Sequence, residues 1–437
     1  MQAVAKPKKG ATNVKSLTKS IRTKFAAEDA QVQLSLPVAG VLRDVQSAFY
    51  GLCINAGKAV LGAMMEAERT ALCGPKGVPD SQRTAYRGGH TRTSVVLGGR
   101  RIAIHRPRAH ALQAQELPLP TFQWATQCDP LNAATLAAIA AGVSTRRYRS
   151  TLDPLPITEV QSSVSRSAVS RRFVALSAEQ LGQWLSRRIE VELPAVMIDG
   201  IYFQDRVVLL ALGFDTQGRK HVLGLWEGST EKATVVRALL ASLIERGLNA
   251  DTPRLWIIDG GKAIRRAILE VFGATAFIQR CQEHKRRNVI EHLPDELHTS
   301  VGRAMKDAWE SRDPVLARRQ LDRLANSLAK SHPGAATSLR EGLEETLALI
   351  GLGIDGALYR TLRTTNPIEN LNGRVAHHTR NVKRWRDGHM VLRWIAAALN
   401  EARRGFRALR GHRDMRQLTS ALAKASVSTA NEKLKFA

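Results

Sequence analysis

Three acidic side chains stand where a carboxylate is costly or unexpected, and they are the first candidates for chemistry. Asp199 in "VMIDGIYF" and Asp259 in "WIIDG" each follow an apolar run, and apolar residues continue beyond Asp199. Glu369 in "TTNPIENLNGRV" is the only acid between Asp355 and Asp387, a segment with seven lysines and arginines. A carboxylate in an apolar strand is costly unless it meets a cation or several hydrogen-bond donors. The three positions therefore predict a functional use.

Each of these acids also has an ordinary structural interpretation. Asp-Gly is a common turn signal, so Asp199 and Asp259 are both compatible with simple turns. Asn366 can serve as the N-cap of a helix with Pro367 in its first turn, and Glu369 then completes a capping box by accepting from the cap's backbone N–H. Capping does not exclude a functional role, because the Glu369 carboxylate has two oxygens.

The composition favours polyanionic partners. The chain has 437 residues, of which 44% are hydrophobic, and 65 Lys and Arg against 39 Asp and Glu give a formal net charge of +26. Basic residues concentrate in residues 1–25, 83–108 and 371–416, which together predict a nucleic-acid surface. We expect no membrane span and no secretory leader. Four scattered cysteines predict neither a disulfide framework nor a zinc finger. The expected location is the cytoplasm, on nucleic acid.

The N-terminal part is predicted to bind DNA. Residues 1–30 are predicted as a disordered basic arm, and residues 31–130 as a helical region, with its helix over 38–72 and a small basic hairpin, "TSVVLGGRRIAIH". Residues 131–190 are predicted as a helix-turn-helix-like region whose long helix starts at Ser163 or Ser165. An ordinary polar surface helix is the alternative. The residues predicted to contact DNA from this helix are Arg166, Ser167, Ser170 and Arg171.

The segments from residue 194 onward predict an α/β sheet. "AVMIDGIYF", "RVVLLALGF" and "KHVLGLWEG" are joined by short links and predict an antiparallel meander. A helix, the buried strand "RLWIID", a second helix, the strand "TAFIQ" and a third helix follow, which gives the order βββαβαβα of a ribonuclease-H-like core. The predicted ranges are 191–294 and 356–388 for the core, 295–355 for a helical insertion, and 389–437 for a basic C-terminal helix, over about 389–410, and tail.

This topology predicts a metal site. Open α/β sheets place ligands at the carboxyl ends of their strands, where Asp199, Asp259 and Glu369 would gather. At about 5 Å and an effective dielectric near 20, each pair of carboxylates costs roughly 3 kcal/mol. Divalent cations remove that cost, and hard carboxylate oxygens suit Mg²⁺, with Mn²⁺ as a substitute. Two ions about 4 Å apart would activate an attacking oxygen and stabilise the leaving oxygen of a phosphodiester.

The chain resembles the Mutator-type transposases of prokaryotic insertion sequences. The resemblance rests on "MIDG", "IIDGGKAI", "QRCQEHKRRNV" and "TTNPIENLNGRVAHHTRNVKRW" in that order, and upstream motifs extend it over most of residues 80–400. It implies a ribonuclease-H-like core interrupted by a helical insertion, and an Asp-Asp-Glu metal triad formed by Asp199, Asp259 and Glu369. It also marks Cys281 and His284 as a signature pair near the active site.

Several residues near these motifs have open roles. We favour a structural or substrate-contacting role for Cys281 and His284, because zinc requires four ligands and no second cluster is evident. Trp309 either packs the helical insertion or stacks on an extruded base, and the first is favoured. The basic residues predicted to contact phosphates are Arg280, Lys285, Arg286, Arg287, Arg374, Arg380, Lys383 and Arg384.

The sequence therefore predicts a DNA transposase. It would bind the terminal inverted repeats of an insertion sequence, cut DNA by Mg²⁺-dependent hydrolysis and join a 3′-hydroxyl to target DNA. Holding two element ends together implies a homodimer or larger assembly on double-stranded DNA, in the nucleoid of a prokaryote. The alternatives are a DNA-binding regulator with a relict core and another ribonuclease-H-like nuclease. A purely architectural DNA binder needs no carboxylates on apolar strands.

Overall fold

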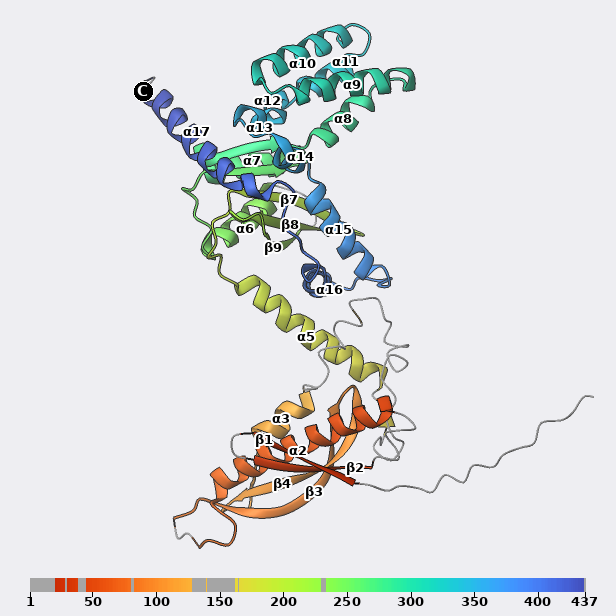
Figure 1. Ribbon diagram of the computed structural model, residues 1–437, viewed down its shortest axis with the longest axis vertical. Helices are drawn as coiled ribbons and strands as arrows, with labels where there is room; N and C mark the ends of the chain where they lie inside the picture. Colours follow the sequence, from red (N-terminus) through yellow and green to blue (C-terminus); the bar gives the residue numbers. More distant parts are fainter. Residues whose placement is uncertain are drawn as a thin grey trace, which may run out of the picture. The chain divides into compact units, whose positions relative to one another are not determined.

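The computed structural model describes residues 20–27, 30–37, 45–79, 82–127, 139, 162–163, 165–228 and 233–435 (Figure 1). The chain divides into two compact units, which we describe separately. Unit 1 comprises Met1–Ile139 and Val143–Phe173, and unit 2 comprises Ala140–Gly142 and Val174–Ala437. The first helices of the predicted helix-turn-helix, over residues 131–161, lie outside the described residues apart from residue 139.

Unit 1 begins with a pair of strands where we predicted a disordered arm. β1 (Ser20–Ala27) pairs antiparallel with β2 (Ala30–Pro37), so the arm predicted over residues 1–30 is wrong from residue 20 onward. The reason is the alternation in "SIRTKFAA" and "AQVQLSLP", in which apolar residues fall at every second position except Thr23 and the period is that of a strand. Residues 1–19 lie outside the described residues.

A long helix and a hairpin form the rest of unit 1. The predicted helix is α2 (Val45–Cys73). The predicted hairpin is confirmed: β3 (Ala85–Leu97) and β4 (Arg100–Ala111) pair antiparallel, and both turn glycines, Gly98 and Gly99, have positive φ, as a tight hairpin turn requires. The remaining elements are β5 (Glu116–Leu117), α3 (Pro120–Gln127) and β6 (Ser162–Ser163).

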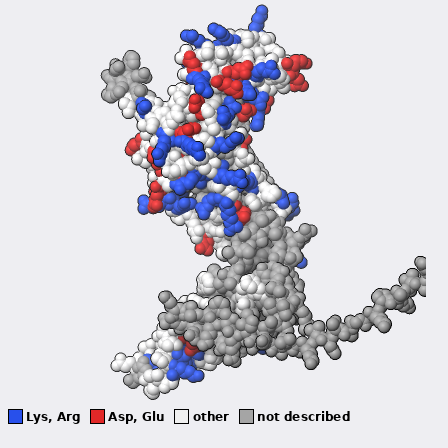
Figure 2. Space-filling view, viewed as in Figure 1, with Lys and Arg blue, Asp and Glu red and all other residues white. Residues whose placement is uncertain are grey.

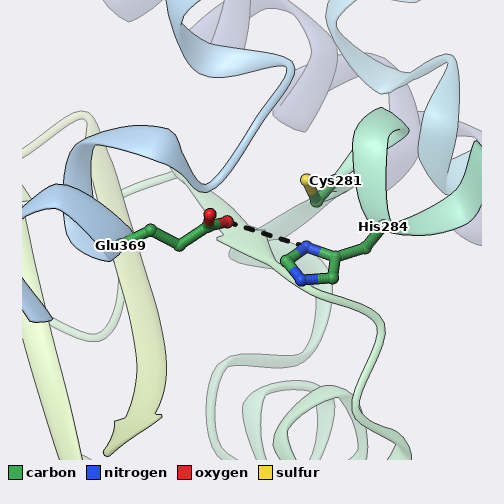
Figure 3. Close-up of side chains that lie close together, drawn as sticks. All are labelled: Cys281, His284 and Glu369. Carbon is green, nitrogen blue, oxygen red and sulfur yellow. Dashed lines mark ion pairs between the residues drawn. The ribbon is translucent and has the colours of Figure 1, made fainter. Parts of the chain in front are cut away.

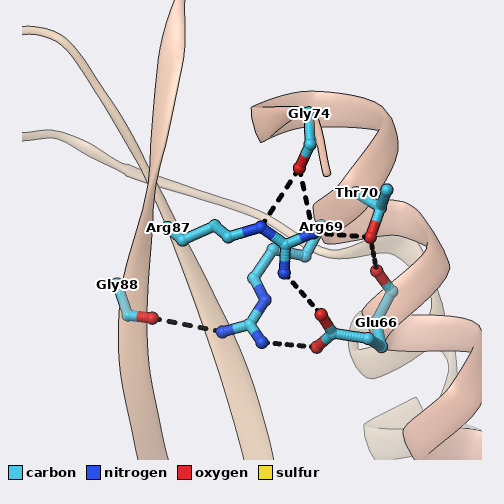
Figure 4. A network of polar contacts seen from close by, with 6 residues as sticks. All are labelled: Glu66, Arg69, Thr70, Gly74, Arg87 and Gly88. Carbon is cyan, nitrogen blue, oxygen red and sulfur yellow. Dashed lines mark hydrogen bonds and ion pairs between the residues drawn. The ribbon is translucent and has the colours of Figure 1, made fainter. Parts of the chain in front are cut away.

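Polar contacts hold α2 to the hairpin (Figure 4). The Arg87 guanidinium donates to the Glu66 carboxylate at 2.5 Å, to the Thr70 hydroxyl at 2.7 Å and to the Gly74 carbonyl at 2.9 Å. The Arg69 guanidinium donates to the same carboxylate and also to the carbonyl of Gly88. Arg87 of the hairpin therefore binds groups within unit 1.

Helix α5 (Arg166–Ser186) begins as predicted and crosses the boundary between the units. The Ser165 hydroxyl accepts from the backbone N–H of Ala168 at 3.2 Å, which is the N-cap interaction. Farther along, the Trp184 ring N–H donates to the Asn400 side-chain oxygen at 3.2 Å. The second half of α5 therefore packs within unit 2.

Unit 2 is built on a five-stranded mixed sheet in the order β11-β10-β7-β8-β9. β7, β8 and β9 form the predicted antiparallel meander, and β10 pairs in parallel with both β7 and β11. β7 is therefore the central strand, as predicted. The bounds are β7 Ala195–Phe203, β8 Arg206–Phe214, β9 Lys220–Gly228, α6 Ala233–Glu245, β10 Arg254–Ile258, α7 Lys262–Phe272, β11 Ala276–Arg280 and α8 Gln282–Ile290.

Both faces of this sheet are buried, and alternate residues of each strand face opposite layers. On β8, Leu209 packs in the layer of α6 and α7, whereas Leu210 packs with the layer that contains α15 (Asn366–Thr379) and α16 (Gly388–Arg403). On β7, Met197 and Ile201 pack in the α15 layer. Asp199 lies two residues from Met197 and two from Ile201 on the same strand, so its side chain belongs to the face that α15 covers.

Helices fill the chain between α8 and α15 (Figure 1). Trp309 of this segment is 3% exposed, and its ring N–H donates to the Thr346 hydroxyl at 3.1 Å. It is a core tryptophan in this structure, and the interpretation as a base-stacking residue is withdrawn. The bounds are α9 Asp295–Glu310, α10 Pro314–Leu328, α11 Pro333–Arg340, α12 Leu343–Thr346, α13 Ala348–Gly351 and α14 Gly356–Leu362.

The C-terminal segment differs from its prediction. The basic helix predicted over about 389–410 ends at Arg403, and the predicted tail contains the short 3₁₀ helix η4 (His412–Asp414) and a further helix, α17 (Met415–Lys435). Gly411, the N-cap of η4, has a φ of 81° and lies against the backbone of Leu358 in α14. No helix in the described part of the chain combines the length and apolarity needed to cross a lipid bilayer.

The close approach at Gly411 generates a stability prediction. A Cβ at this position would collide with the Leu358 backbone, and its φ favours glycine, so Gly411→Ala should lower the free energy of unfolding by about 2 kcal/mol or more. Gly351→Ala is the control, because a Cβ there meets open space and should be neutral or stabilising by up to about 1 kcal/mol. Urea unfolding measures both, and equal effects would contradict the packing described.

Candidate active site

The two aspartates predicted for the site lie in one row of the sheet. β10 pairs in parallel with β7, with Ile257 opposite Met197. Carrying this register two residues onward places Asp259 beside Asp199. Neighbouring strands lie about 4.8 Å apart, so sheet pairing alone brings together two carboxylates that are 60 positions apart in the sequence.

Cys281 continues the same row directly after the next strand, β11. β11 pairs with β10 in parallel, with Arg280 opposite Ile258, and the backbone N–H of Cys281 donates to the Ile258 carbonyl at 2.7 Å. The next residue pair is therefore Cys281 and Asp259. By this extended register, Asp199 on β7, Asp259 directly after β10 and Cys281 directly after β11 fall in one row.

Helix α15 lies along this row and is attached to it at two points. At the N-cap, the Thr365 N–H donates to the Cys281 sulfur at 3.4 Å; in the middle of the helix, the Asn372 amide donates to the Asp199 carboxylate at 2.7 Å. Seven residues of helix rise about 10.5 Å, which matches the roughly 9.6 Å across two strand spacings. Glu369 lies between these attachments on the same helix face, because residues four and seven positions after the first share that face.

The start of α15 corrects the predicted capping box. The helix begins at Asn366 with Thr365 as its N-cap, and no side chain caps it. The Thr365 N–H is taken by Cys281, and Glu369 accepts a hydrogen bond from the Thr365 hydroxyl instead of from a backbone N–H. The capping interpretation is therefore wrong for both Asn366 and Glu369. Glu369 does not cap its helix and is available for the site.

Cys281 and His284 lie beside Glu369 (Figure 3). Ligand atoms of the three residues lie within 4.8 Å of one another, and His284 Nδ1 is 3.7 Å from Glu369 Oε1. The Thr365 hydroxyl contacts both the His284 ring, at 3.3 Å, and the Glu369 carboxylate. A protein oxygen therefore already bridges these groups, so the cluster is a hydrogen-bonded network in this structure rather than an open metal cage.

The electrostatics of the pair follow from these contacts. A hydrogen bond with Cys281 is the main reason that the pKa of His284 is raised, and the nearby Glu369 and Asp259 charges add to it. Burial opposes ionisation of the Cys281 thiol, but hydrogen bonds from His284 and Thr365 outweigh it and lower its pKa. His284 is thereby favoured as a cation next to the carboxylates.

Asp199 is the most perturbed carboxyl of the site. Its Oδ1 accepts from the Gly200 N–H at 2.9 Å, and its Oδ2 accepts from Asn372. Burial raises its pKa to about 6; the Gly200 hydrogen bond opposes this shift, and the Asp259 and Glu369 charges add to it. Asp259 follows β10 at a turn, where its Oδ1 accepts from the Gly261 N–H at 2.8 Å. The Asp259 and Glu369 charges therefore both act on the Asp199 carboxyl.

The oxygen chemistry of this donor set suits divalent cations of the Mg²⁺ type. Asp199, Asp259 and Glu369 would supply hard oxygen ligands, and their mutual repulsion is the cost that bound cations remove. A second observation points the same way: the Asn372 side-chain oxygen is buried and has no hydrogen-bond partner. Such an orphan acceptor is costly unless a further group occupies the site.

Two of the predicted DNA-contacting residues have internal roles instead. Arg280 is 5% exposed and Lys285 fully buried. The guanidinium of Arg280 donates to the Glu341 carbonyl at 2.8 Å, and the Lys285 ammonium donates to the carbonyls of Ser338 and Glu341. Burial, together with the Arg280 charge, lowers the pKa of Lys285 to about 8. The prediction that they contact phosphates is wrong for this structure, because both side chains fix the end of α11.

The other predicted contact residues reach the surface. Arg286 is half-buried and paired with Glu283 at 3.0 Å. The exposed ones are Arg166, Ser167, Ser170, Arg171, Arg287, Arg374, Arg380, Lys383 and Arg384. Figure 2 shows Lys and Arg gathered over the part of unit 2 that holds α15 and α16, whereas both signs are mixed over α9–α11. The helix that carries Glu369 therefore also borders a positive surface.

Two residues of the site were absent from the predictions. Thr365 and Asn372 lie four residues before and three residues after Glu369, so both share its helix face. Helical spacing places them near Glu369 but does not by itself reveal their roles. Their partners, Cys281 and Asp199, lie on other elements.

The chain belongs to the Mutator transposase family, whose model matches residues 33–408. Similar curated proteins include the transposase of insertion sequence element ISRM5 from Rhizobium meliloti (strain 1021), 25% identical over 350 residues, which covers 78% of this chain and 85% of that protein. The transposase of IS406 from Burkholderia multivorans is 29% identical over 349 residues, 76% of this chain and 86% of that one. The transposase of IS256 in transposon Tn4001 from Staphylococcus aureus is 25% identical over 356 residues, with 78% and 87% covered.

The raised pKa of Asp199 predicts how stability changes with pH. A carboxyl whose folded pKa, about 6, exceeds its unfolded value stabilises the fold when protonated, and this contribution is lost as the pH rises through 6. Relative to Asp199→Ala, the unmodified protein should therefore lose about 2 kcal/mol of unfolding free energy between pH 4 and pH 7. Urea unfolding in EDTA measures the difference. A constant difference, or one that changes in the opposite direction, would contradict the described environment.

Proposed function

We propose that this Mutator-family transposase is a metal-dependent DNA-cleaving and strand-joining enzyme. In this proposal unit 2 is a ribonuclease-H-like catalytic core, formed by the mixed sheet with α15, and the helices between α8 and α15 are an insertion in it. Asp199, Asp259 and Glu369 are its catalytic triad. The enzyme binds the terminal inverted repeats of an insertion sequence and inserts the excised or nicked end into target DNA.

One observation carries this proposal. Extending the register of β7 and β10, which pairs Ile257 with Met197, sets Asp259 beside Asp199, and helix α15 brings Glu369 against the same row through attachments at Thr365 and Asn372. A structural explanation would have to account for three mutually repelling carboxylates, one with a pKa raised to about 6. Strongly perturbed acids gathered at one place are typical of functional sites.

The chain's own residues would hold the cations and orient the side chains that bind them. Asp199, Asp259 and Glu369 would bind Mg²⁺ or Mn²⁺, and bound cations would activate the attacking oxygen and stabilise the leaving one. The Thr365 hydroxyl orients one oxygen of Glu369, and His284 balances part of the negative charge. No protein nucleophile is required, so positioning and charge stabilisation supply the rate enhancement.

The positive surface over α15 and α16 supports DNA as the substrate. Exposed Arg374, Arg380, Lys383 and Arg384 follow Glu369 on α15 and in the loop after it. Neutralising phosphates releases counterions, which provides sequence-independent affinity beside the triad. Recognition of the element ends would come from unit 1 and α5, and pairing of two ends would require a homodimer or larger assembly on the nucleoid DNA of a prokaryote.

The triad can be tested by single alanine substitutions of Asp199, Asp259 and Glu369. Each variant should keep DNA binding and lose Mg²⁺-dependent cleavage of DNA that carries the sequences flanking the gene, by about a thousandfold or more. Asp205→Ala is the matched control, because Asp205 is an exposed acid in the turn after β7. Cleavage retained in any triad variant, or lost equally in the control, would overturn the assignment.

The DNA surface can be tested through the salt dependence of binding. A Lys383→Ala/Arg384→Ala double variant should bind DNA more weakly, and its plot of log affinity against log salt should be less steep by about 1.8, or roughly 0.9 for each phosphate that the variant no longer neutralises. Arg319→Ala/Arg323→Ala, which removes two exposed charges from α10, should leave the slope unchanged. Equal slopes for all three proteins would exclude the α15–α16 loop from the DNA-binding surface.

A further inference from the structure

The amide of Asn372 joins the two elements that carry Asp199 and Glu369. Its Nδ2 donates to Asp199 Oδ2 at 2.7 Å, while its own Oδ1 is buried without a hydrogen-bond partner. If the Asn372 amide were turned by 180°, its Oδ1 would face Asp199 Oδ2, and two acceptor oxygens would oppose each other. The donor is therefore committed to Asp199, and one acceptor is left over inside the site.

The position of Asn372 on α15 makes this contact part of the site geometry. Asn372 lies one helical turn after Glu369, and this spacing keeps both on one helix face. The hydrogen bond therefore fixes Asp199 of β7 relative to the helix that presents Glu369. Thr365, bonded to Cys281, is the second attachment at the other end of the row.

We propose that Asn372 is a further positioning residue of the active site, which holds the Asp199 carboxylate in place for divalent cations; this inference rests on the proposed function. Each oxygen of a carboxylate has two acceptor directions, so Oδ2 can bind a cation while it still accepts from Asn372. Carboxylates that ligate metals are commonly held by such hydrogen bonds. The unpartnered Asn372 oxygen supplies an acceptor for water of the hydrated cation.

Mn²⁺ binding in the absence of DNA tests this role without relying on catalysis. Isothermal titration calorimetry on the full chain should give an Asn372→Ala variant with about tenfold or more weaker Mn²⁺ binding than the unmodified protein. Asn370→Ala is the matched control, because Asn370 is an exposed asparagine on the same helix, and it should bind as the unmodified protein does. Asp199→Ala reports independently whether Mn²⁺ binds at the triad.

An Asn372→Asp variant separates positioning from a merely structural role. It sets a carboxylate against Asp199 Oδ2, so without metal its melting temperature should fall below that of Asn372→Ala. Because cations relieve this repulsion, Mn²⁺ should raise the melting temperature of Asn372→Asp by more than it raises that of Asn370→Asp or of the unmodified protein. A structural contact alone predicts losses that do not depend on Mn²⁺.

The outcomes distinguish failure of this inference from failure of the proposed function. If the unmodified protein binds Mn²⁺ and Asp199→Ala does not, the proposed metal site stands. Weaker binding by Asn372→Ala alone, with the Mn²⁺-dependent rise in Asn372→Asp, then supports the positioning role. Binding by Asn372→Ala equal to that of the unmodified protein overturns this inference alone. Absence of Mn²⁺ binding by the unmodified protein overturns both.

Discussion

The site depends on a match between two spacings, the rise of a helix and the separation of strands. The seven steps from Thr365, the N-cap of α15, to Asn372 rise about 10.5 Å, and the row from Cys281 to Asp199 spans two strand separations, about 9.6 Å. Hydrogen bonds at both ends hold helix and sheet in this register. A shift of α15 by one residue would turn Glu369 by about 100° away from the row. The sheet sets where two carboxylates lie, and the helix sets where the third can be.

The electrostatics of this arrangement are unfavourable without cations. Asp199 is placed on a buried sheet face between Met197 and Ile201, and burial, together with the nearby Asp259 and Glu369 charges, raises its pKa to about 6. His284, whose own pKa is raised, offsets part of this negative charge. In the proposed function, such a site would lower the stability of the fold in exchange for affinity for cations, which is a common relation between stability and function.

Much of the sheet followed from sequence, because strand alternation and short links restrict the possible topologies. The site followed less completely. Asp199 was identifiable as an acid inside an apolar run, but Thr365 and Asn372 gain their roles from partners on distant strands, which local pattern does not reveal. Lys285 was misjudged because its charge was given more weight than its spacing: Cys281, Lys285 and Val289 recur every four residues on the buried face of α8, and that period favours burial.

The central claim is that Asp199, Asp259 and Glu369 converge on the same cations, and crystallography with Mn²⁺ tests it most directly. Anomalous scattering from crystals of the full chain grown with Mn²⁺ locates the ions independently of any activity. The account predicts anomalous peaks within coordination distance of the Asp199 carboxylate and at least one of the other two acids, with Asn372 still bonded to Asp199. A peak held by Cys281 and His284 without Asp199, or well-ordered carboxylates with no peak between them, would contradict it.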